Sequence, residues 1–516
     1  MKTYKLILLI LINVLFFVGC EEYLDEAPSK SNGVIPSTVQ DLEGLLNDRN
    51  TFVAENANEI IAASDDYGLN SNYFDVDPQE YNISLIHDAT WNNEFPAFSE
   101  FHIWEGEWEK IFTANLVLEA LDLVEGNADD KANLKAEAHF IRAYSYFLLA
   151  NTYCLALKGN ESELGLPIKV STSFEESLER VSLEQTYNFI TSDVEEALKI
   201  TRRLEEKNGY KRIWRASTAA VNAFAARYYL ALHDYDKAEQ YAQNSLDEHN
   251  TLRNLNTDVN LVSQIQNIER DGDPSTTETA TLLYPNFLGR FSGGEDKYIW
   301  EEFYYDREMV NNLGELYPSN DLLNLYDQSN DLRFQYFMVE NHSYVRGADG
   351  IDNPLFSQTG YTDVVGSSSR TISGPSVPEM YLIVAECQVR KGNFASGLAM
   401  ANILRRTRMD NSAPTSAIDL SASSQQEALT KILNERRREL PFVLRWYDLK
   451  RYNSNDDASD DVDNLTRSFY PYSQLAVDGS SSVQVYTLPK NSHGYARPIP
   501  NNDIVTSGGI LKQNQY

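Results

Sequence analysis

The 516-residue chain is poor in cysteine and in basic residues. Its three cysteines cannot provide a disulfide framework for a chain of this length, which has enough residues to bury a large apolar core instead. The 44 Lys and Arg are outnumbered by 76 Asp and Glu, so the formal net charge is -32. An acidic surface repels phosphate, and the composition therefore argues against nucleic-acid binding and against purely electrostatic attachment to anionic lipid.

Motifs of common hydrolases and nucleotide-binding enzymes are missing from the sequence. It contains no HExxH, no GxSxG and no P-loop. Carboxylate pairs are abundant, but a glycosidase needs two carboxyl groups at a defined separation in a cleft, which spacing alone does not indicate. The run NSNDDASDDVD at residues 453–463 lacks the turn glycine and the distal glutamate of a calcium loop, so we expect a solvated acidic loop. We therefore predict no catalytic residue, no metal ligand and no cofactor.

An apolar run at the N-terminus has the layout of a secretory signal. Lys2 and Lys5 precede residues 6–18, and this run is too short to span a bilayer as a helix. We therefore predict that residues 1–19 are a signal peptide that does not belong to the fold, and that residues 20–36 form an extended tether.

The signal ends in FVGC at residues 17–20, which is similar to the lipobox at which bacterial lipoproteins are cleaved and acylated. We predict lipidation at Cys20, for example by palmitate. A plain cleaved signal is the alternative, because Phe17 stands where a lipobox usually has Leu. Several acyl chains would anchor the protein stably, since each buried methylene contributes about 0.8 kcal/mol. The two glutamates after Cys20 resemble the signal that exports such lipoproteins to the cell surface.

Two stretches of the chain share a helical pattern. Residues 222–246 align with residues 381–404, so that small and aromatic residues coincide. The aligned pairs are Ala226 with Ala385, Tyr235 with Phe394, and Ala238 with Gly397. Units of this kind stack because they cannot bury their apolar faces alone. The pattern indicates tetratricopeptide-like helical hairpins, with a chance alignment of two unrelated hairpins as the alternative.

The remaining patterns divide the chain into three parts. Residues 37–250 and 379–516 are mostly helical, whereas Gly, Pro, Ser and Asp punctuate residues 251–378. A long insertion between hairpins lies on one face of such a scaffold, which makes this insert the candidate ligand face. Residues 56–96 have no sustained period and are predicted to be loops. The expected fold is mostly α, a tetratricopeptide-like helical hairpin scaffold with a long irregular, loop-rich insert.

Several side chains have predicted structural roles. Ser37 with Gln40 and Ser182 with Gln185 have the spacing of capping boxes that begin helices. The remaining predictions place Trp104 and Trp108 in the core, Cys154 and Cys387 in apolar helices as buried small side chains, and Asp331 with Arg333 in a structural turn. The three consecutive arginines of ERRREL, residues 435–440, are flanked by acids in an apolar helix, which favours an internal ion-pair network over an anion-binding patch.

Two C-terminal motifs resemble a known family. ERRREL followed by RWYDLKR, residues 445–451, is similar to a signature of the SusD/RagB family, the surface lipoproteins with which Bacteroidetes bacteria capture nutrients. The ending PIPNNDIVTSGGILKQNQY, residues 498–516, also resembles that family's terminus. The chain has Val443-Leu444 where the family usually has Glu-Gly, and it ends in QNQY rather than QNPGY. These departures concern local turn geometry.

The resemblance implies a binding protein that is not an enzyme. Family members work with a SusC-like TonB-dependent transporter in the outer membrane, where the helical hairpins dock on the transporter and the lipoprotein covers its mouth. The implied ligand is most often a glycan, held before import. The implied location is the outer membrane, with a lipid anchor and the protein facing the cell exterior.

Aromatic residues in the irregular segments are candidates for glycan binding. A sugar presents apolar C–H faces ringed by hydroxyls, so its site needs flat aromatic rings and nearby polar groups. Tyr73 with Trp91, and Trp300 with Tyr304, supply this chemistry. For each of them the alternative is a packed aromatic with no ligand.

Two other functions are left open by the sequence. A surface glycoside hydrolase would need a carboxyl pair in the ligand cleft. A family member that handles a non-glycan, peptide-like nutrient would have its aromatics packed inward.

Overall fold

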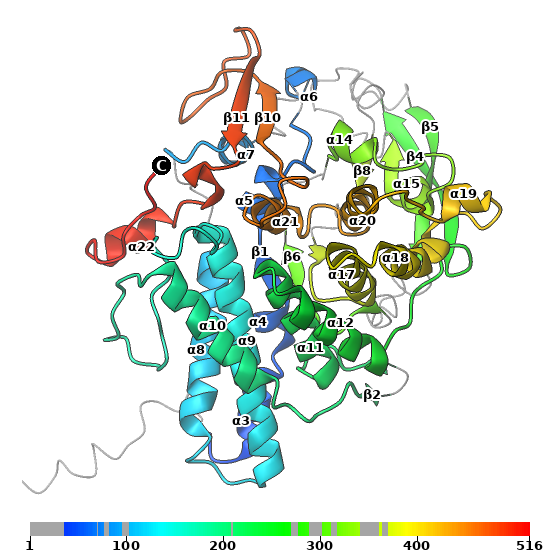
Figure 1. The fold of residues 1–516 in the computed structure, drawn as a ribbon. Helices are drawn as coiled ribbons and strands as arrows, with labels where there is room; N and C mark the ends of the chain where they lie inside the picture. The colour runs from blue at the N-terminus through cyan, green and yellow to red at the C-terminus, as the bar shows by residue number, and fades with distance from the viewer. Residues whose placement is uncertain are drawn as a thin grey trace, which may run out of the picture.

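Helices dominate the residues that the structure describes. In this computed structural model these are residues 36–69, 71–76, 82–94, 103–207, 210–269, 277–287, 302–310, 317–340, 361–363 and 370–516. The longer helices are α8 (Ile103–Ala120), α9 (Ala128–Tyr153), α10 (Leu183–Ala197), α11 (Thr218–Ala231), α12 (Tyr235–Glu248), α17 (Val377–Arg390), α18 (Phe394–Arg408) and α20 (Gln425–Glu439). Each helix of this series packs on the next, which gives a row of helices (Figure 1). The predicted mostly α scaffold is confirmed.

Helix α9 is the most deeply buried helix at the N-terminal end of this row. It packs against α8, α10 and α11, and every residue from Phe140 to Tyr153 is buried. A helix that is buried all round has neighbours on every side. Trp104 and Trp108 of α8 pack edge to face at 5.5 Å, and Trp104 is buried, as predicted. Gln185 and Ser182 form the predicted capping box at the start of α10.

The two aligned hairpins are α11–α12 and α17–α18. Tyr235 and Phe394 each begin the second helix of a hairpin, as the alignment predicts. Gly397 marks the closest approach, because an added Cβ would lie 2.6 Å from the carbonyl oxygen of Ala385. The aligned Ala238 is fully buried. Small residues therefore stand where helices touch in both hairpins.

The turns of these hairpins also correspond. Gly392 has a φ of 89°, and His233, at the aligned position, has a φ of 61°. This left-handed region is natural for Gly and uncommon for other residues. His233 is held there by its Nε2, which lies 2.9 Å from the carbonyl oxygen of Arg451. In the first hairpin, a tertiary contact of His233 thus stabilises the left-handed conformation that Gly392 adopts freely in the second.

We expect His233→Asn to reduce the loss of stability in mild acid. Burial, together with the cationic Arg451 and Lys158, lowers the pKa of His233 from 6.5 to about 4. The unfolded chain takes up this proton at a higher pH than the folded protein, so stability falls as the pH drops from 6.5 towards 4. Asn tolerates the left-handed conformation and donates a hydrogen bond from its amide.

The measurement is urea unfolding at pH 7.5 and pH 4.5. The difference in unfolding free energy between the two pH values should be smaller in His233→Asn than in the wild type by about 1–2 kcal/mol. His493→Asn, at an exposed histidine, serves as the control and should leave the difference unchanged. An unchanged difference in His233→Asn would contradict the prediction.

Short helices correct two expectations from the sequence. The additional helices are α3 (Val39–Leu46), α4 (Arg49–Val53), α5 (Asn58–Ala63), α6 (Ser71–Val76), α7 (Ile83–Ala89), α14 (Asn320–Leu323), α15 (Leu332–Phe337), α19 (Thr415–Ile418), α21 (Arg445–Tyr452), η3 (His493–Tyr495) and α22 (Asn501–Thr506). Residues 56–96 therefore contain helices rather than loops alone. The first capping box is formed by Thr38 and Asp41, one residue later than predicted for Ser37 and Gln40.

The described strands form one small sheet of three strands and four of two strands. They are β1 (Ala54–Asn56) with β6 (Glu308–Val310) and β9 (Arg370–Ile372), β2 (Glu206–Lys207) with β3 (Tyr210–Lys211), β4 (Val259–Glu269) with β5 (Thr277–Phe287), β7 (Met338–Glu340) with β8 (Tyr361–Asp363), and β10 (Asn464–Phe469) with β11 (Gln484–Pro489). The long β4–β5 hairpin falls in the insert that the sequence indicated as irregular. The division into three parts stays a prediction.

The predicted signal peptide, the lipidation of Cys20 and the tether up to residue 35 lie outside the described residues. Within the part of the chain that the structure describes, no helix is both long and apolar enough to cross a bilayer.

Candidate functional site

The β10–β11 hairpin lies at the top of Figure 1 beside α6. Aromatic side chains from the hairpin and the segment after β10 contact Phe74 of α6 and His87 of α7. The antiparallel register pairs Arg467 with Tyr486 and Phe469 with Gln484, so these four side chains lie on one face of the hairpin. Leu465, Arg467 and Phe469 alternate with exposed residues along β10. This face of the hairpin therefore points towards the protein and brings its aromatics to α6 and α7.

Four partly exposed rings, Phe74, Tyr470, Tyr472 and Tyr486, form what we call the aromatic platform. The ring of Phe74, from α6, lies 5.9 Å from that of Tyr470. Tyr472 stacks on Tyr486 with 5.4 Å between ring centroids. Rings that are fixed by such contacts keep a flat apolar surface without losing side-chain entropy on binding.

Polar groups surround these rings. Tyr470 donates to a carboxylate oxygen of Asp75 at 3.0 Å, and Tyr486 donates to the backbone carbonyl of Tyr470 at 2.9 Å. The amide nitrogen of Gln484 lies 2.5 Å from the Tyr486 hydroxyl. Hydrogen bonding to Asp75 raises the pKa of Tyr470. A carboxylate and an amide thus stand beside aromatic faces, which is the chemistry that a sugar ring needs.

Arg467 joins the β10–β11 hairpin to the rest of the protein by hydrogen bonds. Its buried guanidinium donates to the carbonyl oxygens of Ala62, Ser64 and Tyr67 at the end of α5, and to that of Ala89 at the end of α7. Burial lowers the pKa of Arg467 to about 10. Because β10 is joined in this way to α5 and α7, the position of the aromatic platform depends on one side chain.

The structure places two of the four predicted ligand residues in the core. Trp91 is 7% exposed, donates from Nε1 to the carbonyl of Ala63 at 2.9 Å, and lies against the guanidinium of Arg467. Tyr304 is 0% exposed and donates to the carbonyl of His249 at 2.6 Å. These contacts favour the alternative of packed aromatics, and ligand binding by the two residues stays a prediction.

The other two candidates differ in what the structure describes. Tyr73 belongs to α6, directly before Phe74 of the aromatic platform, and its side chain lies outside the described residues. Trp300 lies outside them altogether. Tyr470, Tyr472 and Tyr486 were not predicted from the sequence. In NLTRSF, residues 464–469, a charged Arg467 stands between the apolar Leu465 and Phe469, so the sequence has no clear apolar–polar alternation to indicate the strand that leads to them.

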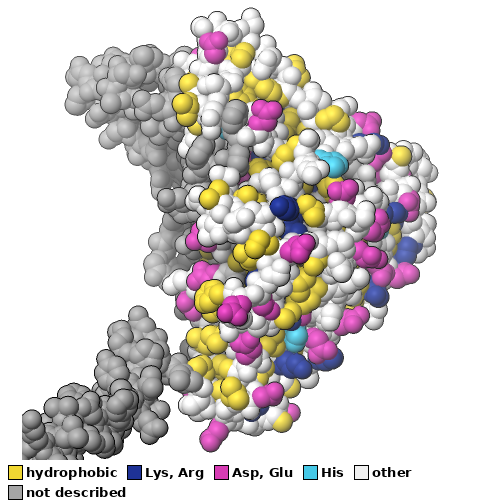
Figure 2. Space-filling view, turned by 90° about the vertical axis from the view of Figure 1, so that its left-hand side faces the viewer, with side chains coloured by type: hydrophobic (Ala, Val, Ile, Leu, Met, Phe, Trp, Pro, Cys, Tyr) yellow, Lys and Arg dark blue, Asp and Glu magenta, His cyan; other side chains and the backbone are white. Residues whose placement is uncertain are grey.

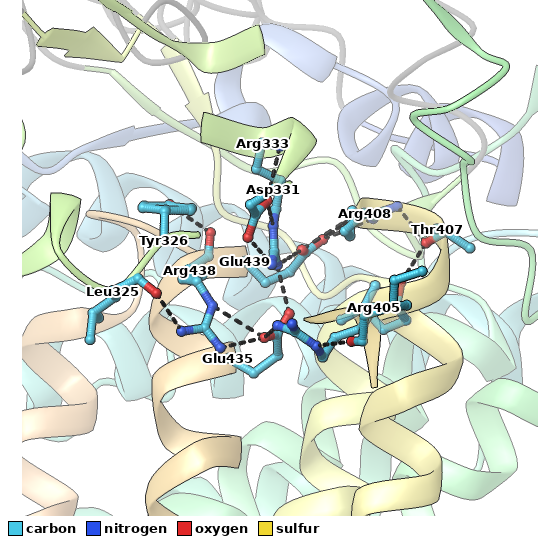
Figure 3. Close-up of polar contacts among 12 residues, drawn as sticks. Leu325, Tyr326, Asp331, Arg333, Arg405, Thr407, Arg408, Glu435, Arg438 and Glu439 are labelled. Carbon is cyan, nitrogen blue, oxygen red and sulfur yellow. Dashed lines mark hydrogen bonds and ion pairs between the residues drawn. The ribbon is translucent and has the colours of Figure 1, made fainter. Parts of the chain in front are cut away.

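An ion-pair network joins α18 and α20 to Asp331 and Arg333 of the insert (Figure 3). Glu435 of α20 lies 2.6 Å from both Arg405 and Arg438 and 2.8 Å from Arg333. Burial alone would raise the pKa of Glu435, but Arg333, Arg438 and Arg405 hold it well below its usual range. Arg333 also pairs with Asp331 at 2.8 Å. The predicted ion-pair role of ERRREL and the predicted Asp331–Arg333 turn are confirmed.

One arginine of each C-terminal motif reaches the N-terminal part of the chain. Arg437 pairs with Asp66 at 2.6 Å. Arg445 donates hydrogen bonds to both carboxylate oxygens of Asp65, at 2.6 and 2.8 Å. Burial alone would raise the pKa of Asp65, yet Arg445 and Arg437 lower it far below its usual range. Asp65 and Asp66 follow α5. Their ion pairs therefore hold in place the segment after α5, whose backbone carbonyls bind Arg467 of the hairpin.

Among the described residues, no group of three or more His, Cys, Asp or Glu side chains is placed to hold a metal ion. Cys154 and Cys387 are buried thiols, as predicted, and burial raises the pKa of both. In the acidic loop, Asp460 pairs with Arg390, and Asp461 pairs with Lys490 at 2.5 Å, so that loop is only partly solvated.

Family models cover both ends of the chain. A model described as "Starch-binding associating with outer membrane" matches residues 22–230, and the SusD family model matches residues 377–516. The chain belongs to the SusD/RagB family. The second match contains ERRREL and RWYDLKR, the motifs that the sequence analysis identified.

Relatives share this architecture over their whole length. SusD-like protein P2 of Formosa agariphila is 20% identical, with 100% of this chain and 99% of the relative covered. A putative sugar binding protein of Bacteroides vulgatus has a TM-score of 0.61 at 16% identity, covering 93% of this chain and 99% of the other. A laminarin-binding SusD-like protein has a TM-score of 0.56 at 15% identity, with the same coverage. At this identity the solved structures show a shared fold.

Proposed function

We propose that the protein binds a carbohydrate at the outer membrane and delivers it to a SusC-like TonB-dependent transporter, without catalysing a reaction. The observation that carries the proposal is the aromatic platform in a chain of the SusD/RagB family. The family model described as starch-binding and outer-membrane-associating, and the laminarin-binding structural neighbour, support a glycan as the ligand. Lipid attachment at Cys20 would hold the protein at the membrane.

A binding role fits the chemistry of the aromatic platform better than catalysis does. Retaining glycosidases need two carboxyl groups about 5–5.5 Å apart and inverting ones about 6.5–9.5 Å apart, on opposite sides of the bond that is cleaved. At the aromatic platform, Asp75 is held by the Tyr470 hydroxyl and acts as an acceptor for a ring substituent. Tyr73 and Trp300 remain candidates for extending the site beyond the described rings.

Affinity electrophoresis of the unlipidated protein in gels containing starch or laminarin tests this proposal. The wild type should be retarded, and Tyr470→Ala or Tyr486→Ala should weaken the retardation about 3- to 10-fold, because each removes one stacking ring. Phe174→Ala is the matched control, since this ring is 93% exposed on the loop between α9 and α10. A parallel assay should detect no released reducing sugar.

The outcomes separate the competing functions. Released reducing sugar would contradict the non-enzymatic role and favour a surface glycoside hydrolase. No retardation by any polysaccharide would favour a non-glycan, peptide-like nutrient. Retardation that is unchanged in both tyrosine variants would place the binding site away from the aromatic platform.

A further inference from the structure

A polar cavity lies where the end of α9, helix α21 and the segment after β11 meet. Its volume is about 330 Å³. The lining residues are Leu155, Ala156, Lys158, Gly159, Asn160, Lys450, Asn453, Ser454, Lys490, Asn491, Ser492, His493 and Tyr495. Three lysines and a histidine are among them, and none of these lining residues is acidic. Viewed from the side of α22, the surface carries scattered acidic side chains with few basic ones between them (Figure 2). The cavity, which has no acidic lining residue, therefore differs in charge from that face of the molecule.

Lys450 provides a buried positive charge in the wall of this cavity. It is 4% exposed, and its Nζ donates to the carbonyl oxygens of Asn151 and Cys154 at 2.5 and 2.6 Å. These are terminal carbonyls of α9, whose dipole favours a cation. A protonated ammonium has three N–H groups, so one remains beyond the two that bind α9. Burial lowers the pKa of Lys450 to about 7, so near neutral pH about half of the molecules carry this charge, and a bound carboxylate would favour the charged form.

Lys158 and Lys490 add charge at the rim. Lys158 pairs with Asp456 at 2.5 Å, and Lys490 pairs with Asp461 at 2.5 Å. Neither aspartate lines the cavity, and the Asp456 side chain is 90% exposed. The Lys158–Asp456 pair is exposed and contributes only about 0–1 kcal/mol. Lys490 also lies 3.3 Å from Asp463, which is 74% exposed, and its own side chain is 31% exposed, so both ammonium groups can still donate to a second anion. The acidic loop thus positions the two lysines without filling the cavity.

The space is large enough for a sugar ring. A second cavity of about 340 Å³ shares Leu155 and His493 with the first and adds Asn514 and Gln515. Ligand sites of drug-sized molecules measure about 300–1,000 Å³. Amide groups line both cavities, the first also has the hydroxyls of Ser454, Ser492 and Tyr495, and the second also has the carboxylate of Glu163. Such polar groups match the hydroxyls of a saccharide, and the first cavity, which has no acidic lining residue, suits an acidic one. The lysine ammonium groups would bind an anionic group, which a neutral sugar does not have.

We propose that this cavity binds a sugar acid, with its carboxylate held by Lys450, Lys158 and Lys490 and its hydroxyls facing the amides around them. The inference rests on the proposed carbohydrate-binding function and adds a second site, apart from the aromatic platform, for an acidic saccharide unit. Charge-assisted hydrogen bonds to a carboxylate are about twice as strong as neutral ones, which gives the site its preference for the acid.

Isothermal titration calorimetry with glucuronate and with glucose tests the proposal. The wild type should bind glucuronate at least about tenfold more tightly than glucose at low salt. The double variant Lys158→Gln/Lys490→Gln should lose at least about tenfold in glucuronate affinity. Lys391→Gln is the matched control, because this lysine also bridges two carboxylates, Asp236 and Glu239, and should bind like the wild type.

Two further arms make the result decisive. Lys450→Met, if it folds, should lose glucuronate binding; if it does not fold, the double variant alone decides. Equal affinity for glucuronate in the double variant and the wild type, or no binding of glucuronate, would overturn the proposal. Inorganic sulfate that binds in place of glucuronate would also overturn it, because the site would then take a free anion. Starch or laminarin binding at the aromatic platform would survive either failure, so the two proposals are tested separately.

Discussion

Glu435→Gln should lower the free energy of unfolding by about 3–5 kcal/mol, the usual cost of removing one partner of a buried ion pair. Glu435 is 0% exposed and faces Arg333, Arg405 and Arg438. Arg333 would retain Asp331 and Glu439, but within the described chain Glu435 is the one carboxylate paired with Arg405 and with Arg438. The variant therefore leaves two guanidinium groups with carbonyl partners alone.

Urea unfolding followed by circular dichroism measures this loss. Glu427→Gln, on the same helix, is the control, because its exposed pair with Lys431 should contribute less than about 0.5 kcal/mol. Adding Arg405→Met to Glu435→Gln removes one of the uncompensated charges and should restore part of the stability, so that the two changes are not additive. Additive losses would show that the arginine and the glutamate act independently.

The ion pairs of Glu435 also predict how the stability of the protein depends on pH. Since the pKa of Glu435 is held well below its usual range in the folded protein, its contribution is present above the pKa of an ordinary glutamate and is lost as the pH falls through the folded value. Glu435→Gln should therefore lose less stability between pH 7 and pH 3 than the wild type does. A loss equal to that of the wild type would mean that Glu435 is not the source.

The parts of the scaffold that could be predicted are those encoded by residues close together in the sequence. The helical hairpins follow from a period that spans ten or more residues, and the ion-pair network follows from three arginines between acids in an apolar helix. Helix α5 has six residues, fewer than two turns, and such a helix exists only because tertiary packing stabilises it. No period of the sequence could have indicated it.

The candidate site could not be predicted because its residues meet through distant contacts. Phe74 and Tyr470 are neighbours only after the β10–β11 hairpin docks on α6, and Arg467 joins residues up to 400 positions apart. Trp91 and Tyr304 had the right chemistry, but Trp and Tyr serve equally well as buried aromatics with one hydrogen bond. Only the burial of each ring, which sequence spacing does not encode, distinguishes the two roles.

Arg467→Lys is the second substitution with a large expected effect. A guanidinium binds several carbonyls in its plane, whereas an ammonium has three donors and a different reach. Three donors leave at least one of the four carbonyls of Ala62, Ser64, Tyr67 and Ala89 without a donor, and the different reach of lysine leaves a second, at about 1–3 kcal/mol each. We expect a loss of about 2–4 kcal/mol by urea unfolding, against less than about 0.5 kcal/mol for Arg406→Lys, an exposed arginine paired with Asp419.

The consequence for binding distinguishes Arg467 from a residue that only stabilises the fold. A two-stranded hairpin is marginally stable by itself, so β10–β11 depends on its docking to keep Tyr470 and Tyr486 beside Phe74. Arg467→Lys should therefore raise amide hydrogen exchange in residues 464–489 and weaken polysaccharide retardation, although every ring of the aromatic platform is intact. Glu435→Gln, measured under conditions where it is folded, should leave both unchanged. If Arg467→Lys destabilises the protein but preserves retardation, the aromatic platform does not carry the binding.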